Sequence, residues 1–234
     1  MPRILAIETA TKACSVAVAD ESSILGEISL FVPQVHAERL VVMLNNLLEN
    51  LRLSYRELDA VAFSSGPGSF TGLRIGLSVA KGIAFGQKKE LIAVPTLEAI
   101  ASGFQGQLRP GELVVPILHA RANEFYYAAY LGKNSELEQE TSSRVADADS
   151  IVAEFPPEAI FVGEGVVAFS KHGKVKSKFE RLKNLPASAR DVATIARDKF
   201  VRGEFADLRT SVPMYIKDFM AIKGNPLSKL SEKI

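Results

Sequence analysis

Short apolar runs, separated by short polar connections, make up the first 31 residues of the chain. The runs cover residues 3–9, 14–20 and 24–31. Runs of this length, rich in Ile, Val and Ala and bounded by polar residues, are typical of β-strands, and short connections join antiparallel neighbours. The pattern therefore predicts a three-stranded antiparallel meander at the start of the chain.

Over residues 34–53 the pattern changes to a helical period. Apolar side chains recur there every three or four positions, which predicts an amphipathic helix. These positions are Leu40, Met43, Leu44, Leu47, Leu48 and Leu51. A buried-type strand at 59–65, a helix at 70–86, a strand at 91–96 and a helix at 97–104 follow. Helices that alternate with strands in this way predict a mixed sheet with covered faces.

Turn-forming residues cluster at 106–112, and we place a boundary there between two lobes, residues 1–108 and 109–234. Strand-like runs then resume, and a helix with Ser188 as its N-cap closes the pattern. The runs are 113–120, 124–131, 140–146 and 159–165, and the helix is 188–205. Each lobe thus begins with a meander and continues with helix and strand alternation. The predicted fold class is α/β, with two lobes and mixed sheets.

Composition is that of an ordinary globular protein: 234 residues, 47% hydrophobic and 24% charged, with a formal net charge of +1. A near-neutral chain has few of the clustered cations that grip a nucleic-acid backbone, so we expect it not to hold nucleic acid alone. The densest basic run, residues 170–184, is interpreted as a solvated loop.

The single cysteine, Cys14, excludes an internal disulfide and a cysteine-rich zinc site, and it stands in a strand-like run where a small packing residue is expected. The first 12 residues do not form a signal-peptide pattern. No apolar run approaches the roughly 20 residues of a membrane span. We therefore expect a cytoplasmic protein that does not enter a membrane.

Six of the chain's 16 glycines lie in residues 60–86, between a predicted strand and a predicted helix. Such a loop can bind phosphate at a helix N-terminus, but the known spacings do not fit. Gly66 and Gly72 are one residue too far apart for a P-loop, and Leu73 and Arg74 follow in place of lysine and a hydroxyl residue. The dinucleotide motif is likewise missed by one residue, because three residues separate Gly68 from Gly72.

Small residues recur every four positions on this helix, at Gly72, Gly76, Ala80 and Ala84. Such a ridge lets another element approach closely, and two alternatives stay open: packing within this lobe, or contact with another subunit.

Two polar residues belong to the same segment. Ser69 is the expected N-cap of the helix. Arg74 lies in the first turn, where the helix dipole disfavours a cation, so we expect it to have an anionic partner. Candidate partners are Glu8, Glu98 or a carboxylate of another subunit.

Four segments together resemble the TsaB (YeaZ) family: residues 4–18, 36–40, 64–86 and 120–130. The resemblance implies a shortened member of the actin, Hsp70 and sugar-kinase superfold, with two ribonuclease-H-like lobes. It also implies a role in installing threonylcarbamoyl on the adenosine that follows the anticodon, in tRNAs that read codons beginning with adenine. In that system a larger TsaD subunit carries out the transfer, TsaB-like chains are its obligatory partner, and an ATPase subunit, TsaE, completes the assembly.

From this resemblance we expect the helices at 35–51 and 70–86 to form an interface, with TsaD or with a second copy of the chain when it is alone. The predicted interface residues are Leu40, Met43, Leu47, Phe70, Gly72, Arg74, Gly76 and Ala80. Contact with tRNA is expected to be only indirect. No cofactor is expected to be required, and weak ATP or ADP binding is expected at most at the subunit junction.

The superfold holds phosphates at its first hairpin, with an acid, hydroxyls and usually glycine. Here residues 8–15 contain no glycine, and Glu8 stands where the family usually has Asp. Glu8, Thr9 and Thr11 are therefore interpreted either as a vestigial nucleotide-binding loop or as residues that only shape a turn.

No metal site and no catalytic residue is predicted. The histidine pair that TsaD relatives use for a cation corresponds here to Thr96 and Ile100. The three histidines, His36, His119 and His172, are far apart in sequence and are expected to be caps or surface residues. His119 also replaces a usual Asp, which weakens a nucleotide role for the second lobe.

The leading hypothesis is thus a partner subunit that is non-catalytic or binds nucleotide weakly. The alternative is an independent ATP-dependent phosphotransferase of the sugar-kinase type. A peptidase would need a motif such as H-E-x-x-H or G-x-S-x-G, and the chain has neither. Residues 220–234 are predicted to be a mobile or docking tail.

Overall fold

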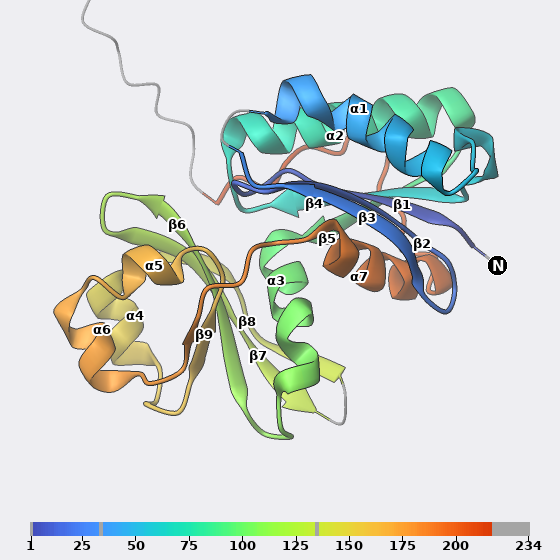
Figure 1. The fold of residues 1–234 in the computed structure, drawn as a ribbon. Coiled ribbons are helices and arrows are strands. Elements are labelled where there is room, and N and C mark those ends of the chain that lie inside the picture. Colours follow the sequence, from blue (N-terminus) through green and yellow to red (C-terminus); the bar gives the residue numbers. More distant parts are fainter. Residues whose placement is uncertain (1, 33–34, 134–135, 217–234) are drawn as a thin grey trace, which may run out of the picture.

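Two five-stranded mixed sheets form the two lobes of the molecule, which lie side by side in Figure 1. The computed structural model describes residues 2–32, 35–133 and 136–216. The first sheet has the order β3-β2-β1-β4-β5. Its strands are β1 (Ile4–Glu8), β2 (Cys14–Ala19), β3 (Ile24–Leu30), β4 (Ala60–Gly66) and β5 (Glu90–Pro95).

Strands β1, β2 and β3 pair in antiparallel fashion, which confirms the predicted meander. Strand β4 then runs parallel to β1, and β5 runs parallel to β4. Every residue of β1, β2 and β4 is buried, because helices cover both faces of this sheet. The near-continuous apolar sequence of these strands follows from that burial.

The second sheet repeats this scheme, with the order β10-β9-β6-β7-β8. Strands β6, β7 and β8 form an antiparallel meander, β9 runs parallel to β6, and β10 runs parallel to β9. The strands are β6 (Leu113–Arg121), β7 (Glu124–Lys133), β8 (Glu136–Asp147), β9 (Ile160–Val162) and β10 (Leu182–Lys183). The common plan expected for the two lobes is confirmed, although β10 was not predicted.

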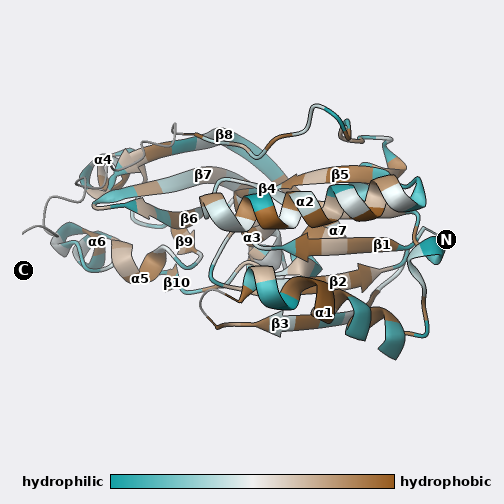
Figure 2. Cartoon of the chain, turned by 90° about the horizontal axis from the view of Figure 1, so that it is seen from above, coloured by the Kyte–Doolittle hydropathy of each residue, from teal (hydrophilic) through white to brown (hydrophobic). Residues whose placement is uncertain are grey.

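Seven α-helices connect the strands in the described residues. They are α1 (His36–Asn50), α2 (Phe70–Gln87), α3 (Thr96–Phe104), α4 (Ala148–Glu154), α5 (Val166–Phe169), α6 (Gly173–Lys178) and α7 (Ala189–Val201). Short 3₁₀ turns occur at Tyr55–Glu57 and Gln105–Gln107. Figure 2 shows α1 and α2 side by side over one face of the first sheet. The basic run 170–184, expected to be a loop, contains α6 and β10.

The last helix of each half packs against the sheet of the other half. The apolar face of α3 joins the core of the second lobe, where Leu97 and Phe104 cluster with Val114. Helix α7 lies against the first sheet, where Val192 clusters with Ile4. The predicted lobe boundary assigned α7 to the second lobe, residues 109–234, whereas α7 packs against the first sheet. This exchange ties the two lobes together.

After α7 the chain returns along the first lobe. The amide of Ala206 donates to the carbonyl of Leu91 at 2.7 Å, and the amide of Met214 donates to the carbonyl of Ser65 at 2.7 Å. This segment therefore ends beside the loop that follows β4. The predicted tail, residues 220–234, lies outside the described residues. Within the described ranges, no helix combines the length and the apolar character needed to cross a bilayer.

Candidate functional site

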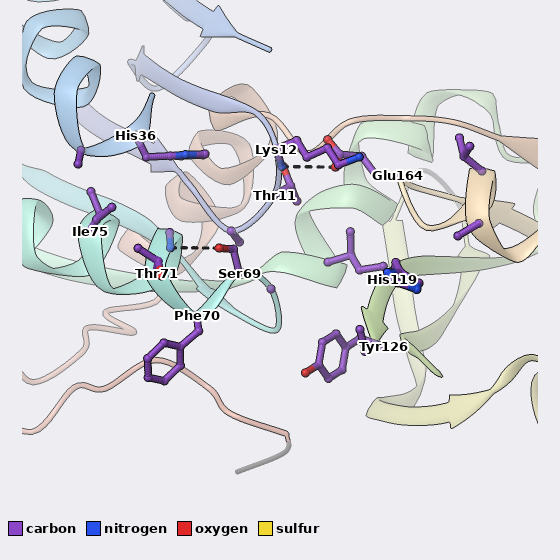
Figure 3. A pocket seen from close by; sticks show the side chains of 18 of the residues that line it. Thr11, Lys12, His36, Ser69, Phe70, Thr71, Ile75, His119, Tyr126 and Glu164 are labelled. Carbon is purple, nitrogen blue, oxygen red and sulfur yellow. Dashed lines mark hydrogen bonds between the residues drawn. The ribbon is translucent and has the colours of Figure 1, made fainter. Parts of the chain in front are cut away.

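A cavity with a volume of about 1010 Å³ lies between the two lobes. The β1–β2 turn and the N-terminal end of α2 line one side of it, and residues of β6, β7 and α5 line the other (Figure 3). Thr11, Lys12 and Phe70 come from the first lobe, and His119 and Tyr126 from the second. Of the three residues predicted as a vestigial nucleotide loop, Thr11 lines this cavity, whereas Glu8 and Thr9 are buried behind it.

Glu8, at the end of β1, is fully buried and is bonded within its own lobe. The amide of Ala10 donates to its Oε1 at 2.6 Å, and the hydroxyl of Ser64 donates to its Oε2. Burial raises the pKa of Glu8 to about 7, and the hydrogen bonds from Ser64 and Ala10 limit that rise. Both carboxylate oxygens are therefore committed to internal partners.

The two threonines of the turn are also committed to internal bonds. The hydroxyl of Thr9 donates to the carbonyl of Gly72 at 2.8 Å, and that of Thr11 accepts from the amide of Ala13 at 3.2 Å. Thr9 is 1% exposed and Thr11 is 8% exposed. This bonding matches the second of the two interpretations, in which the hydroxyls shape a turn.

The glycine ridge of α2 packs against this turn. A Cβ at Gly72 would lie 2.0 Å from the carbonyl oxygen of Thr9, and one at Gly76 would lie 2.2 Å from Thr9 Oγ1. A Cβ at Gly68 would lie 2.3 Å from the carbonyl oxygen of Ala10. These glycines are needed for the close approach of α2 to the hairpin. Of the two alternatives for the ridge, the structure supports packing within this lobe.

Six of the eight predicted interface residues lie in the interior of the first lobe. They are Leu40, Met43, Leu47, Gly72, Gly76 and Ala80, and all are buried. The side chain of Met43, the most exposed of the three on α1, is 4% exposed. Helical spacing marked these positions because they face their own sheet. A partner cannot reach these six residues while the lobe is folded, so their predicted role as interface contacts is corrected.

The other two, Phe70 and Arg74, contact the C-terminal segment, and Phe70 also lines the cavity. The Arg74 guanidinium stacks 3.8 Å from the Phe70 ring centroid, and its Nε donates to the hydroxyl of Tyr215 at 3.0 Å. The rings of Phe70 and Tyr215 are 5.2 Å apart. The two internal candidates, Glu8 and Glu98, were wrong, because an aromatic ring and a phenol hydroxyl hold Arg74 within this chain. Ser69 does cap the helix, accepting from the amide of Gly72 at 3.2 Å.

The three histidines occupy separate positions. His36 Nε2 is 3.1 Å from the carbonyl oxygen of Ala13, and His119 Nε2 is 2.9 Å from that of Ala122. His172 stands edge-on to Phe125, with 6.0 Å between the ring centroids. Among the described residues, no group of three or more His, Cys, Asp or Glu side chains gathers in a metal-binding arrangement.

Three further residues from the sequence analysis are interior. Thr96 and Ile100, at the positions of the TsaD histidine pair, are both 0% exposed. Cys14 is buried in the core of the first lobe, where burial raises the pKa of its thiol to about 11, so its predicted packing role is confirmed.

The outward faces of α1 and α2 carry large apolar side chains that the sequence analysis did not single out. Val41 is 49% exposed, Val42 is 46% exposed, and Phe85 is 79% exposed. Val41 and Val42 fall between buried positions of α1, and Phe85 follows the last buried position of α2, so their exposure could have been expected from the helical period. These residues give the two helices an apolar outer surface.

Sequence comparison places this fold among known proteins. The family model for TsaD, tRNA N6-adenosine threonylcarbamoyltransferase, matches residues 31–212. The tRNA threonylcarbamoyladenosine biosynthesis protein TsaB of Escherichia coli K12 is 32% identical over 230 residues, which cover 96% of this chain and 98% of that protein. TsaB of Haemophilus influenzae is 32% identical over 179 residues, covering 72% of this chain and 74% of the relative.

Structural comparison agrees. YeaZ from Pseudomonas aeruginosa superposes with a TM-score of 0.78 at 28% identity, covering 92% of this chain and all 100% of that one. A second Pseudomonas aeruginosa structure, of an uncharacterized protein with similarity to peptidase YEAZ, gives 0.81 at 27% identity, covering 93% and 100%. The predicted two-lobed α/β fold is confirmed. The chain therefore belongs to the TsaB (YeaZ) family and has a role in tRNA threonylcarbamoyladenosine biosynthesis.

Proposed function

We propose that this chain is the partner subunit that a TsaD-like catalytic subunit needs for threonylcarbamoyl transfer. The acceptor is the adenosine that follows the anticodon in tRNAs reading codons that begin with adenine. In this role the chain binds and activates the TsaD-like subunit in the cytoplasm, and a TsaE-like ATPase joins through the complex. The chain contributes no catalytic residue and requires no cofactor of its own.

The observation that carries this proposal is the bonding of the first hairpin. Glu8, Thr9 and Thr11 direct their oxygens to the chain itself, and α2 packs directly against the turn. A phosphate would have to displace these buried hydrogen bonds, and each lost partner would leave a buried polar atom unpaired. The hairpin therefore supports a scaffold better than a phosphotransferase.

The outer surface of α1 and α2 is the proposed contact for the TsaD-like subunit. Val41, Val42 and Phe85 expose apolar side chains there. Burying such side chains against a partner stabilises a complex in proportion to the apolar area removed from water. The same helices are proposed to pair two copies when the chain is alone, and a weakly held ATP or ADP at the subunit junction stays a prediction.

Reconstitution tests the proposed activity. The purified chain is mixed with tRNA, TsaD-like and TsaE-like subunits and threonylcarbamoyl-adenylate, and the modified nucleoside is measured by mass spectrometry after digestion. We expect modification only when this chain and the TsaD-like subunit are both present. Modification by this chain without a TsaD-like subunit would overturn the proposal.

Calorimetry separates the proposal from the phosphotransferase alternative. The isolated chain is titrated with Mg-ATP, and ATP hydrolysis is followed in parallel. The proposal predicts negligible hydrolysis and at most weak binding. Tight Mg-ATP binding together with turnover by the isolated chain would favour the alternative.

The proposed contact surface has a matched test. Phe85→Asp places a charge on the outer face of α2 and is expected to prevent assembly with the TsaD-like subunit, measured by sizing chromatography. Val201→Asp, at the end of α7, is the control, because Val201 is 80% exposed and Phe85 is 79% exposed. Unchanged assembly of the Phe85 variant would remove this surface from the proposal.

A further inference from the structure

One short stretch of this chain carries a local excess of positive charge. Residues 171–183 hold six basic residues and one acid, whereas the whole chain has a formal net charge of +1. The rest of the chain is therefore acidic overall. A neutral total charge hides this asymmetry, and it is the local charge that a nucleic-acid backbone meets.

The structure orders this stretch into a turn, α6 and β10, and presents several of its lysines to solvent. Val175 is fully buried, and it anchors α6 to the core of the second lobe. Lys171, Lys174 and Lys176 are exposed on the other sides. Lys171 and Lys176 form no ion pair with any described residue, while Lys174 Nζ lies 3.2 Å from Asp149 Oδ1. Helix α6 thus holds Lys174 and Lys176 where a loop was expected, and Lys171 lies in the turn before it.

The first residue of this basic stretch reaches the cavity between the lobes. Lys171 lines the cavity from the turn that follows α5, and Lys12 lines it from the β1–β2 turn of the first lobe. Among the described lining residues, Glu164 is the only carboxylate, and it accepts from the backbone amide of Lys12 at 3.4 Å. The ammonium group of Lys12 is exposed.

An aromatic ring stands at the same opening. Figure 3 shows Tyr126 on the second lobe side of the cavity, next to His119. Tyr126 is only partly buried. Cations that can meet phosphates, beside a partly exposed ring that can stack on an unpaired base, are the combination by which proteins hold single-stranded parts of RNA.

We propose that tRNA contacts this chain directly, along the basic surface formed by Lys12, Lys171, Lys174 and Lys176. This inference rests on the proposed function, because it makes this chain part of the tRNA-binding surface of the complex. It replaces the expectation that tRNA is contacted only indirectly. The lysines hold backbone phosphates, and Tyr126 lies where an unpaired base would stack.

The strength of this contact follows from the number of free cations. Each phosphate neutralised by a lysine releases condensed counterions, so the contribution of these lysines to tRNA affinity depends strongly on the salt concentration. A few lysines on a chain with a net charge of +1 give little affinity alone. The basic surface therefore acts as an extension of a partner's RNA-binding face, and its effect is measurable in the assembled complex.

The test measures tRNA affinity of the reconstituted complex by fluorescence anisotropy, with unmodified substrate tRNA, over about 50 to 200 mM salt. The variant Lys171→Glu/Lys176→Glu is expected to bind about tenfold more weakly, with a salt dependence lower by about two phosphate contacts. Lys171→Arg/Lys176→Arg keeps the charge and is expected to bind like the unmodified sequence.

The matched control reverses two charges far from the cavity, in Arg56→Glu/Lys88→Glu. Lys88 follows the 18 residues of α2, about 27 Å of helix beyond the end that lines the cavity. This control is expected to leave tRNA affinity within about twofold. All variants are first shown by sizing chromatography to assemble with the TsaD-like subunit.

The outcomes separate this inference from the function on which it rests. If the complex modifies tRNA but the Lys171 and Lys176 reversal leaves affinity and salt dependence unchanged, the RNA contact is wrong and the proposed function stands. If the reversal instead prevents assembly, the basic surface binds protein and the RNA contact is overturned. If the chain with its original sequence does not support modification, the proposed function fails.

Discussion

The two lobes share one strand order but differ in how far the turn between their first two strands is exposed to solvent. In the first lobe, Glu8, Thr9 and Ala10 are at most 2% exposed, because α2 packs on the β1–β2 turn. In the second lobe, His119, Arg121 and Ala122 of the β6–β7 turn are exposed. The same sheet topology therefore carries a first turn whose opening residues are sealed by α2, although Lys12 of that turn is exposed, and a second turn that is open.

The cause is the element that follows the fourth strand of each sheet. Strand β4 leads into α2, an 18-residue helix whose glycines admit the turn at contact distance. Strand β9 leads into α5, which has four residues, and the chain then turns away into α6. Both sheets thus have a turn between their first two strands, and the helix that follows the fourth strand decides whether a ligand can reach that turn.

The sealing of the first turn is tested most strongly by Gly72→Ala. The new Cβ would lie 2.0 Å from the carbonyl oxygen of Thr9, so the hairpin and α2 must move apart. We expect a loss of about 4 kcal/mol in the free energy of unfolding, measured with urea. Gly82→Ala on the same helix is the control, because nothing lies within 4 Å of its Cβ, and it should stabilise the protein by about 0.5 to 1 kcal/mol. Equal effects of the two changes would contradict the sealed turn.

Glu8→Gln tests the same turn through pH. The pKa of Glu8 rises from 4.5 to about 7 on folding, so the folded state binds the proton more tightly. The stability that Glu8 contributes is present below pH 4.5 and is lost as pH rises to about 7. Relative to the Gln variant, the protein should lose about 3 kcal/mol across that range, by chemical unfolding at both ends. Asp191 also has its pKa raised to about 7, but it is common to both proteins and cancels. A difference that stays constant with pH would show that Glu8 is solvated.

Ser69→Ala removes the N-cap of α2, where the hydroxyl accepts from the amide of Gly72. The expected cost is about 1 kcal/mol in the free energy of unfolding. Ser69→Asp should retain most of the stability, because its carboxylate can cap the same amides and suits the helix dipole. An equal loss in both variants would mean that the cap does not hold the turn.

The open turn of the second lobe should tolerate change. His119→Ala removes an exposed ring that contacts Phe125 and the carbonyl of Ala122. We expect a change of less than about 0.5 kcal/mol in the free energy of unfolding. A loss as large as that from Gly72→Ala would show that the two turns are equally sealed, and the comparison between the lobes would fail.

Much of the fold could be predicted from the apolar pattern. The meanders, the helices α1, α2 and α7, and the repeated plan follow from periods of two and 3.6 residues, because those periods record which side chains are buried. These periods do not show which sheet each buried face packs against. Helix α7 has an ordinary amphipathic pattern, and nothing in it indicates that it covers the first sheet instead of the second.

The same limit explains the predicted interface. The family resemblance placed the helix of Leu40, Met43 and Leu47 at an interface. The helical spacing of these residues identifies a buried face without saying whether the same chain buries it. Arg74 shows a second limit, because its partner Tyr215 is 141 positions away in the sequence. The burial of Glu8 and its bonds to Ser64 and Ala10 depend on tertiary packing, which a local motif cannot report.

The central claim is that the first turn serves the architecture of the chain and takes no part in chemistry. Its most direct test is the rate of tRNA threonylcarbamoylation by the complex carrying Glu8→Gln, at saturating concentration of the TsaD-like subunit. Because glutamine keeps the shape and the acceptor for the amide of Ala10, we predict a rate within about twofold of the original sequence. A loss of about a hundredfold, with folding and assembly unchanged, would contradict the account, because that is the effect expected of a residue that acts on the reacting groups.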